Sequence, residues 1–153
     1  MLRDYPQMGL RTAAIGLELT PQTSDVSPAP RILIIEDELL IALMIEEMCR
    51  EAGYRVSGVA CTVKMARNEL AKRNFDAVLL DISVGGNRYP ESADRLMAKG
   101  IPFAFVTGYD YLVEPRHEKI PVLQKPFSPV QLRDLLQILV GPGSSSGDVT
   151  QTT

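Results

Sequence analysis

Residues 75–82 read FDAVLLDI, a mostly apolar stretch in which the acidic residue Asp81 directly follows Leu80. An apolar run of this length is typical of a strand that is covered on both faces, as in a parallel sheet. Ligands of open parallel sheets bind just beyond the carboxyl ends of the strands. Asp81 is therefore predicted to stand where such a protein performs its chemistry.

The sequence on either side of this run repeats the pattern, because short apolar segments alternate with segments of helical period. Strands are predicted at 31–35, 54–60, 75–80, 102–106 and 122–124, and helices at 38–52, 62–72, 90–99 and 128–140. Alternation of this kind indicates βαβ units. We therefore predict an α/β fold with five parallel strands.

Both ends of the chain differ in composition from this centre. Residues 1–30 contain four prolines, and residues 141–153 are rich in Gly, Ser and Thr. Neither segment can bury enough apolar surface to repay the entropy of ordering it. We expect a flexible N-terminal tail over 1–30, one folded domain over 31–140 and a disordered C-terminal tail over 141–153.

The bulk composition excludes several classes of protein. A net charge of −3 and a pI near 5.2 argue against direct nucleic-acid binding, because no basic surface is available for phosphates. The longest apolar stretch is far shorter than the roughly 20 residues of a membrane span. Cys49 and Cys61 form no disulfide or metal motif. We expect a cytoplasmic protein without a membrane segment.

Polar residues suited to phosphoryl chemistry follow four of the five predicted strands. They are Glu36 and Asp37, then Asp81, Thr107 and Lys125. A carboxylate that attacks a phosphoryl group needs a hard cation such as Mg²⁺, which one or two further carboxylates can hold. An ammonium and a hydroxyl suit the charge that develops on the phosphoryl oxygens.

Each of these residues also has an ordinary explanation. The acidic triplet that ends at Glu38 is favourable at the start of a helix, and Asp81 is a common turn former before a Gly-rich loop. Thr107 can be strand filler and Lys125 a solvated cation. Four independent coincidences at the right strand ends are less probable than one shared site, so the sequence favours a phosphoryl site.

Three segments carry a resemblance to a known family. They are ILIIEDE at 32–38, AVLLDI at 77–82 and LQKPF at 123–127. With the usual separation between Asp37 and Asp81, they make the chain from Arg31 to Val140 similar to a response-regulator receiver domain. The resemblance implies a flavodoxin-like, doubly wound sheet with strand order 2-1-3-4-5.

The resemblance also implies a role for each site residue. Asp81 would accept the phosphoryl group, and Glu36 and Asp37 would hold Mg²⁺ together with Asp81 and the backbone carbonyl of Ser83. Thr107 and Lys125 would contact the phosphoryl group.

This sequence differs from most members of the family at two places, on the fifth strand and in the connection that leads to it. Val122 stands where most receivers have an aromatic residue on the fifth strand. The segment Gly108–Ile120 barely provides the dozen residues of a parallel crossover, so the fourth helix is expected to be shortened or absent. Residues 105–109 resemble the Phe-Ala-Thr-Gly-Tyr-like motif of a mostly single-domain subgroup. Tyr109 is the candidate switch aromatic, or else a loop aromatic packed on the sheet edge.

These features together predict a stand-alone response regulator that is no metabolic enzyme and catalyses only its own phosphoryl transfer and slow dephosphorylation. Its phosphate would come from a histidine kinase or a phosphotransfer protein, because His117 lies in a Pro/Arg/Glu loop unsuited to a donor. It would switch partner binding or act as a phosphate sink. The alternatives are a pseudo-receiver that binds a partner without phosphate, and a haloacid-dehalogenase-like phosphatase, in which Ser83 would replace the second aspartate.

Overall fold

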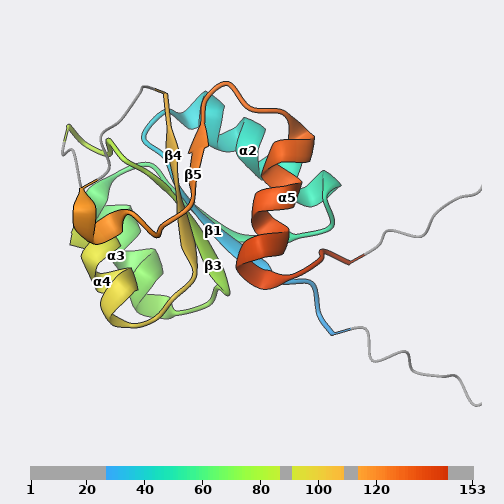
Figure 1. Cartoon of the computed structure of the whole chain (residues 1–153), viewed down its shortest axis with the longest axis horizontal. Coiled ribbons are helices and arrows are strands. Elements are labelled where there is room, and N and C mark those ends of the chain that lie inside the picture. Colours follow the sequence, from blue (N-terminus) through green and yellow to red (C-terminus); the bar gives the residue numbers. More distant parts are fainter. Residues whose placement is uncertain (1–26, 87–90, 109–113, 145–153) are drawn as a thin grey trace, which may run out of the picture.

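A computed structural model describes residues 27–86, 91–108 and 114–144. It contains a five-stranded parallel sheet with the order β2-β1-β3-β4-β5 (Figure 1). The strands are β1 (Arg31–Ile35), β2 (Arg55–Ala60), β3 (Ala77–Asp81), β4 (Phe103–Thr107) and β5 (Val122–Gln124). The predicted fold class and strand order are confirmed.

Four α-helices cover the two faces of the sheet (Figure 1). The helices are α2 (Leu39–Glu51), α3 (Val63–Lys72), α4 (Glu91–Ala98) and α5 (Pro129–Val140). One core lies between the sheet and α2 and α5, and the other lies between the sheet and α3 and α4. Successive residues of β1 alternate between the two cores, as the two-residue period of a strand requires. This packing explains why the strands are apolar throughout.

Local capping sets where the helices begin. The Thr62 hydroxyl accepts the backbone N–H of Met65 at 3.1 Å, which caps α3. Ser128 and Gln131 form a reciprocal capping box at the start of α5, with Pro129 in its first turn. The predicted ranges 62–72 and 128–140 begin at these two cap residues, each of which directly precedes its helix, so both predicted helix starts are confirmed.

The third and fourth strands end one residue later than predicted. Asp81 and Thr107 are the last residues of β3 and β4, because the hydrogen-bonded register of the sheet runs through both ends. Their side chains are thereby held by strand backbone and not by a loop.

The connection from β4 to β5 holds one 3₁₀ turn, Pro115–His117, and no α-helix among its described residues. The expectation of a missing or shortened fourth helix agrees with this. His117 is fully buried, its Nε2 lies 3.0 Å from Asp94 Oδ1 of α4, and its ring meets the ring of Phe105 edge-on. The turn is therefore fixed to both α4 and β4. Tyr109 lies outside the described residues.

The described chain continues four residues past the predicted boundary at Val140. Tyr54 donates its hydroxyl proton to the carbonyl of Gly141 at 2.7 Å, and the N–H of Ser144 donates to the carbonyl of Gly53 at 3.0 Å. Gly53 has a φ of +87°, and the backbone of Ser144 occupies the space that a side chain there would need. The end of α5 is thus joined to the end of α2.

The domain has no membrane-crossing element among the residues described, since none of their helices is both long enough and apolar enough.

Candidate functional site

The carboxyl ends of β1, β3, β4 and β5 lie next to one another at one edge of the sheet, because the strand order makes these four strands neighbours. Each end contributes one or two polar residues to this edge. They are Glu36 and Asp37 after β1, Asp81 on β3, Thr107 on β4 and Lys125 after β5. The predicted site residues from four strands are therefore assembled at one edge.

Three carboxylates form the centre of this site. Oxygen atoms of Glu36, Asp37 and Asp81 all lie within 4.8 Å of one another. Glu36 and Asp81 are 1% and 7% exposed, whereas Asp37 is open to solvent. Oxygen-rich, half-open clusters of this kind fit a hard divalent cation such as Mg²⁺, which keeps several of its waters. The donor set therefore suits the metal that the sequence predicted.

Lys125 places its ammonium between two of these carboxylates. Its Nζ atom lies 2.6 Å from Glu36 Oε2 and 3.5 Å from Asp81 Oδ2. Its backbone N–H donates to the carbonyl of Thr107 at 2.6 Å, and its peptide bond to Pro126 is cis. The lysine is thus fixed at its backbone while its side chain reaches across β4 to β1 and β3.

Backbone donors orient the two buried carboxylates. The N–H of Ser83 donates to Asp81 Oδ1 at 2.9 Å, and the N–H of Glu38 donates to Glu36 Oε1 at 3.1 Å. Asp81 therefore has one oxygen held by backbone and a second oxygen near Lys125. Fixed side-chain rotamers of this kind prepare a site for reaction without reorganisation.

Burial sets the charge of the site. Loss of water raises the pKa of Glu36 to about 7, against the pull of the Lys125 ammonium, and the nearby Asp81 carboxylate adds to the rise. Burial alone would lower the pKa of Lys125, but its contacts with Glu36 and Asp81 outweigh that effect and raise it. Lys125 is therefore a cation at neutral pH, and Glu36 changes its charge close to neutrality.

The family follows from the sequence of the whole domain. A model of the response regulator receiver domain matches residues 32–137. The chain belongs to this family. Receiver domains are regulators and not metabolic enzymes, and they generally bind Mg²⁺ at an acidic pocket.

Three receiver proteins illustrate the relationship. The phyllosphere-induced regulator PhyR of Methylorubrum extorquens is 36% identical over 112 residues, which cover 68% of this chain and 41% of PhyR. The transcriptional regulatory protein PdtaR of Mycobacterium tuberculosis is 30% identical over 129 residues, covering 80% of this chain and 63% of PdtaR. SdrG from Sphingomonas melonis Fr1 is 37% identical with a TM-score of 0.66, and the match covers 74% of this chain and 98% of SdrG. This receiver spans less than two thirds of each of the two longer regulators.

The remaining predicted residues of the receiver site occupy different surroundings. Thr107 is 4% exposed at the end of β4, next in sequence to Val106, which pairs with Asp81. Ser83 is exposed, and its backbone N–H donates to Asp81. A metal-binding role for the Ser83 carbonyl stays a prediction, as does the switching role of Tyr109.

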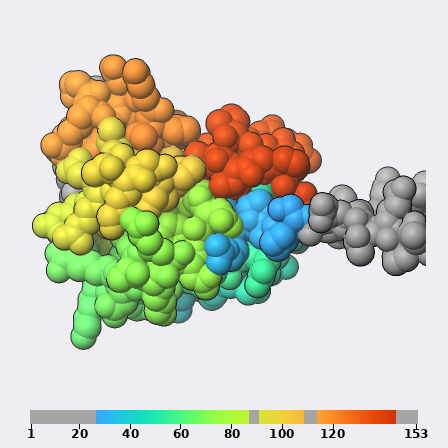
Figure 2. Space-filling model, turned by 90° about the horizontal axis from the view of Figure 1, so that it is seen from below, coloured from blue at the N-terminus to red at the C-terminus, as the bar shows by residue number. Residues whose placement is uncertain are grey.

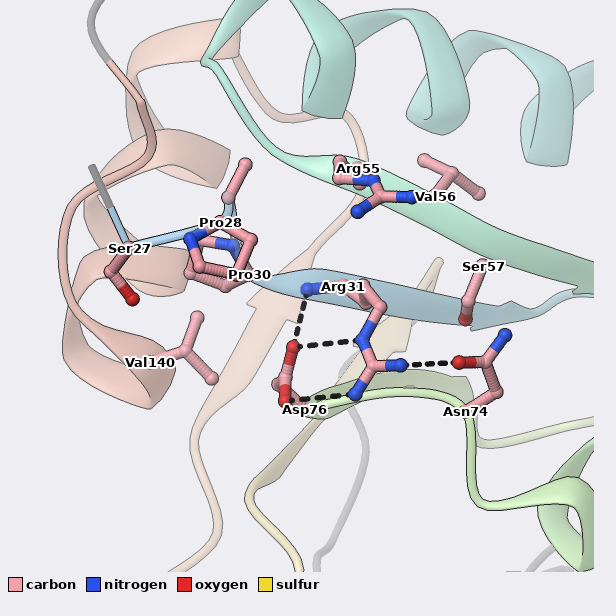
Figure 3. A pocket seen from close by; sticks show the side chains of 11 residues that line it. Ser27, Pro28, Pro30, Arg31, Arg55, Val56, Ser57, Asn74, Asp76 and Val140 are labelled. Atoms are coloured by element: carbon pink, nitrogen blue, oxygen red, sulfur yellow. Dashed lines mark hydrogen bonds and ion pairs between the residues drawn. The ribbon is translucent and has the colours of Figure 1, made fainter. Parts of the chain in front are cut away.

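A hollow of about 660 Å³ lies at the other end of the receiver sheet, where the strands begin (Figure 3). Arg31 donates to Asp76 through its backbone N–H at 2.7 Å and through its guanidinium, and the guanidinium also bonds Asn74. These bonds, the backbone one first, lower the pKa of Asp76. The hollow shares no residue with the acidic site, and its contacts fasten the first strand to the chain before β3.

The pairing of Lys125 with Glu36 could not be predicted from the sequence. The sequence places both residues at strand ends but gives no distance between side chains. The sequence predicted only that Lys125 would contact the phosphoryl group on Asp81, and in the structure its contact with Asp81 is the longer of the two.

Proposed function

We propose that this receiver accepts a phosphoryl group on Asp81 with Mg²⁺ and thereby changes its binding to a protein partner or acts as a phosphate sink. The observation that supports the proposal most directly is the meeting of three carboxylates with Lys125 around one buried strand end. Nothing else in the described chain combines a buried carboxylate nucleophile, a metal donor set and a cation.

The reaction itself is a nucleophilic displacement at phosphorus. A carboxylate oxygen of Asp81 forms a new P–O bond, while the P–N bond of a phosphohistidine donor breaks and its electron pair returns to the imidazole nitrogen. Asp81 is prepared for this role because the Ser83 N–H holds one oxygen of its carboxylate, Oδ1, and so fixes the orientation of the side chain. A small acyl phosphate would transfer its phosphoryl group in the same way, with a carboxylate as the leaving group.

Glu36, Asp37 and Asp81 would hold the Mg²⁺, together with the Ser83 carbonyl. The cation supplies charge neutralisation between the anionic nucleophile and the anionic donor. Lys125 would release Glu36 and turn to a phosphoryl oxygen, a short movement because its ammonium already lies 3.5 Å from Asp81. Thr107 would add a hydroxyl donor from the neighbouring strand.

A protein donor needs a surface beside the acidic site. Four large apolar side chains are exposed at the start of α2, immediately after Asp37 and Glu38: Leu39, Leu40, Leu43 and Met44. Leu40 is 82% exposed, and a group of apolar side chains at one place on the surface is the kind of feature that marks a protein-interaction site. We expect a histidine kinase or phosphotransfer protein to pack on this surface while its histidine reaches Asp81. Two free cysteines suit the reducing cytoplasm in which such donors act.

The test is phosphorylation of the full chain by acetyl phosphate with and without Mg²⁺. We expect the protein to gain the mass of one phosphoryl group, only when Mg²⁺ is present, and to lose it on treatment with hydroxylamine. The gain should disappear in Asp81→Asn. It should persist in the control Asp134→Asn, because Asp134 is an exposed aspartate on α5. A chain that binds neither Mg²⁺ nor beryllofluoride and gains no phosphate would instead be a pseudo-receiver that binds its partner constitutively.

A further inference from the structure

A second surface feature lies between α3 and α4, on the side of the sheet away from α2 and α5. It is a groove of about 130 Å³, here named the α3–α4 groove. In Figure 2 the yellow surface of α4 adjoins the green surface that includes α3. The groove is lined by Arg67, Leu70, Ala71, Arg95, Leu96, Lys99 and Ile101. None of these residues belongs to the acidic site.

The floor of the groove is apolar. Leu96 is 1% exposed, and Leu70 and Ile101 are half-buried at the edge of the core beneath α3 and α4. A cavity of roughly 150 Å³ with walls of this kind holds one benzene molecule. The α3–α4 groove therefore has room for one large apolar side chain.

The rim of the groove is cationic. Arg67 and Arg95 share a single carboxylate, Glu91, at 3.2 and 3.7 Å. Lys99 is exposed and has no ion pair within the described part of the chain. Three cations thus face one anion on a protein whose net charge is −3. This local excess of positive charge stands against the charge of the whole chain.

We propose that the α3–α4 groove binds an acidic, amphipathic segment of a partner protein, which places one large apolar side chain on the floor and carboxylates on the rim. An apolar anchor surrounded by charges is the usual arrangement of a small peptide-binding site. Nucleic acid fits less well, because the groove offers no aromatic side chain for stacking a base and the chain as a whole repels phosphates. The proposal goes beyond phosphoryl transfer and does not depend on it.

The experiment is a selection from a library of short peptides with fixed acidic positions around one random position, using the full-length chain as bait. Enriched peptides are then titrated against two groove variants. Lys99→Glu reverses an exposed rim charge, and Ala71→Phe fills the groove from an exposed position. Arg55→Glu is the matched control, because Arg55 is also exposed, has no ion pair in the described chain and lines the hollow of Figure 3 instead.

We expect enriched peptides to carry one Leu, Ile or Phe, and to shift the backbone amide signals of Leu70, Leu96 and Ile101. Affinity should fall about threefold or more in Lys99→Glu, by about tenfold or more in Ala71→Phe, and not in Arg55→Glu. Thermal melting of each variant shows whether it is folded. Asp81→Asn should bind the peptides as the wild type does, which separates this site from the phosphoryl site.

Several results would overturn the proposal. A library without binders would do so, as would peptides that bind the two groove variants as tightly as the wild type. Self-association that Ala71→Phe abolishes would assign the groove to a second copy of this chain. If a single-stranded RNA probe bound more tightly than the peptides, and Lys99→Glu weakened its binding, the α3–α4 groove would be assigned to nucleic acid.

Discussion

The ammonium of Lys125 is hydrogen-bonded to Glu36 at 2.6 Å and lies 0.9 Å farther from Asp81, at 3.5 Å. The lysine therefore neutralises a buried carboxylate of the proposed metal site while the proposed nucleophile is left mainly to a backbone donor. This arrangement holds the Asp81 oxygen near Lys125 open to an incoming phosphoryl group. It also ties the stability of the domain to the same residues that perform its chemistry.

Replacing Lys125 by Met should destabilise the domain in a pH-dependent way. The change keeps the apolar stem and the backbone bond to Thr107, but it leaves the Glu36 carboxylate buried without a cation. We expect the free energy of unfolding in urea to fall by about 2–3 kcal/mol at pH 8 and by less at pH 5, where Glu36 is protonated. The double variant Lys125→Met/Glu36→Gln should recover most of the loss at pH 8. An equal loss at both pH values would contradict this explanation.

Mg²⁺ affinity should rise with pH through neutrality. Glu36 binds a cation only when ionised, and burial raises its pKa to about 7. At pH 6 about one Glu36 in ten is ionised, so the Mg²⁺ affinity should be about tenfold weaker there than at pH 8. Glu36→Gln should bind Mg²⁺ weakly at both pH values. A pH-independent affinity in the wild type, measured by calorimetry, would exclude Glu36 as a ligand.

In the metal-free domain, the contribution of Glu36 to the free energy of unfolding should fall as the pH rises, whereas the Mg²⁺ affinity should increase. The ordinary pKa of Glu36 is 4.5 and its folded value is about 7. Between these values the folded state holds a proton that the unfolded chain has released, so the contribution of Glu36 to the unfolding free energy declines as the pH rises. Urea unfolding of wild type and Glu36→Gln without Mg²⁺ should differ more at pH 8 than at pH 5, with the variant more stable at pH 8. A constant difference would refute the pKa assignment.

His117 should be important for stability, although it lies in a short connection. Its ring is fully buried, contacts Phe105 and lies 3.0 Å from Asp94. We expect His117→Ala to lower the unfolding free energy by about 2–4 kcal/mol, as other large-to-small changes in cores do. Lys119→Ala, in the exposed part of the same connection, should change it by less than about 0.5 kcal/mol. Similar melting curves for the two variants would argue against the packing described for His117.

Leu40 should matter for a protein donor and not for a small one. Leu40→Ser removes an apolar side chain that is 82% exposed beside the acidic site. We expect phosphotransfer from the cognate kinase to slow about tenfold, while phosphorylation by acetyl phosphate stays unchanged. Ile138→Ser is the control, because Ile138 is 76% exposed on α5. If both donors were affected equally, the α2 surface would have no role in docking.

Much of the fold could be predicted because the information is local. The apolar runs of β1 and β3 are long and uninterrupted, and Thr62 and Ser128 mark helix starts by their own hydrogen bonds. The polar residues that follow the strands come together because all parallel strands end at the same edge. The strand assignments, together with the strand order that the family resemblance implied, therefore sufficed to assemble the candidate site.

What could not be predicted depends on contacts between distant residues. His117 has the sequence surroundings of a loop, yet Asp94 and Phe105 make it part of the core. The bond between Ser144 and Gly53 joins residues that are 91 positions apart in the sequence, and a Gly/Ser-rich composition gives no sign of it. The Lys125 ammonium lies closer to Glu36 than to Asp81 by less than 1 Å, and a difference of this size depends on the positions of the side chains in space.

The segments Ser27–Pro30 and Pro142–Ser144 line a common hollow, so the two ends of the described domain are neighbours at the pole opposite Asp81. Neighbouring ends are what circular permutation requires. A short Gly/Ser linker between them, with new termini opened elsewhere, should leave the acidic site intact. Fluorescent proteins or affinity tags joined directly to Ser27 or Ser144 would likewise start at this pole, away from the acidic site.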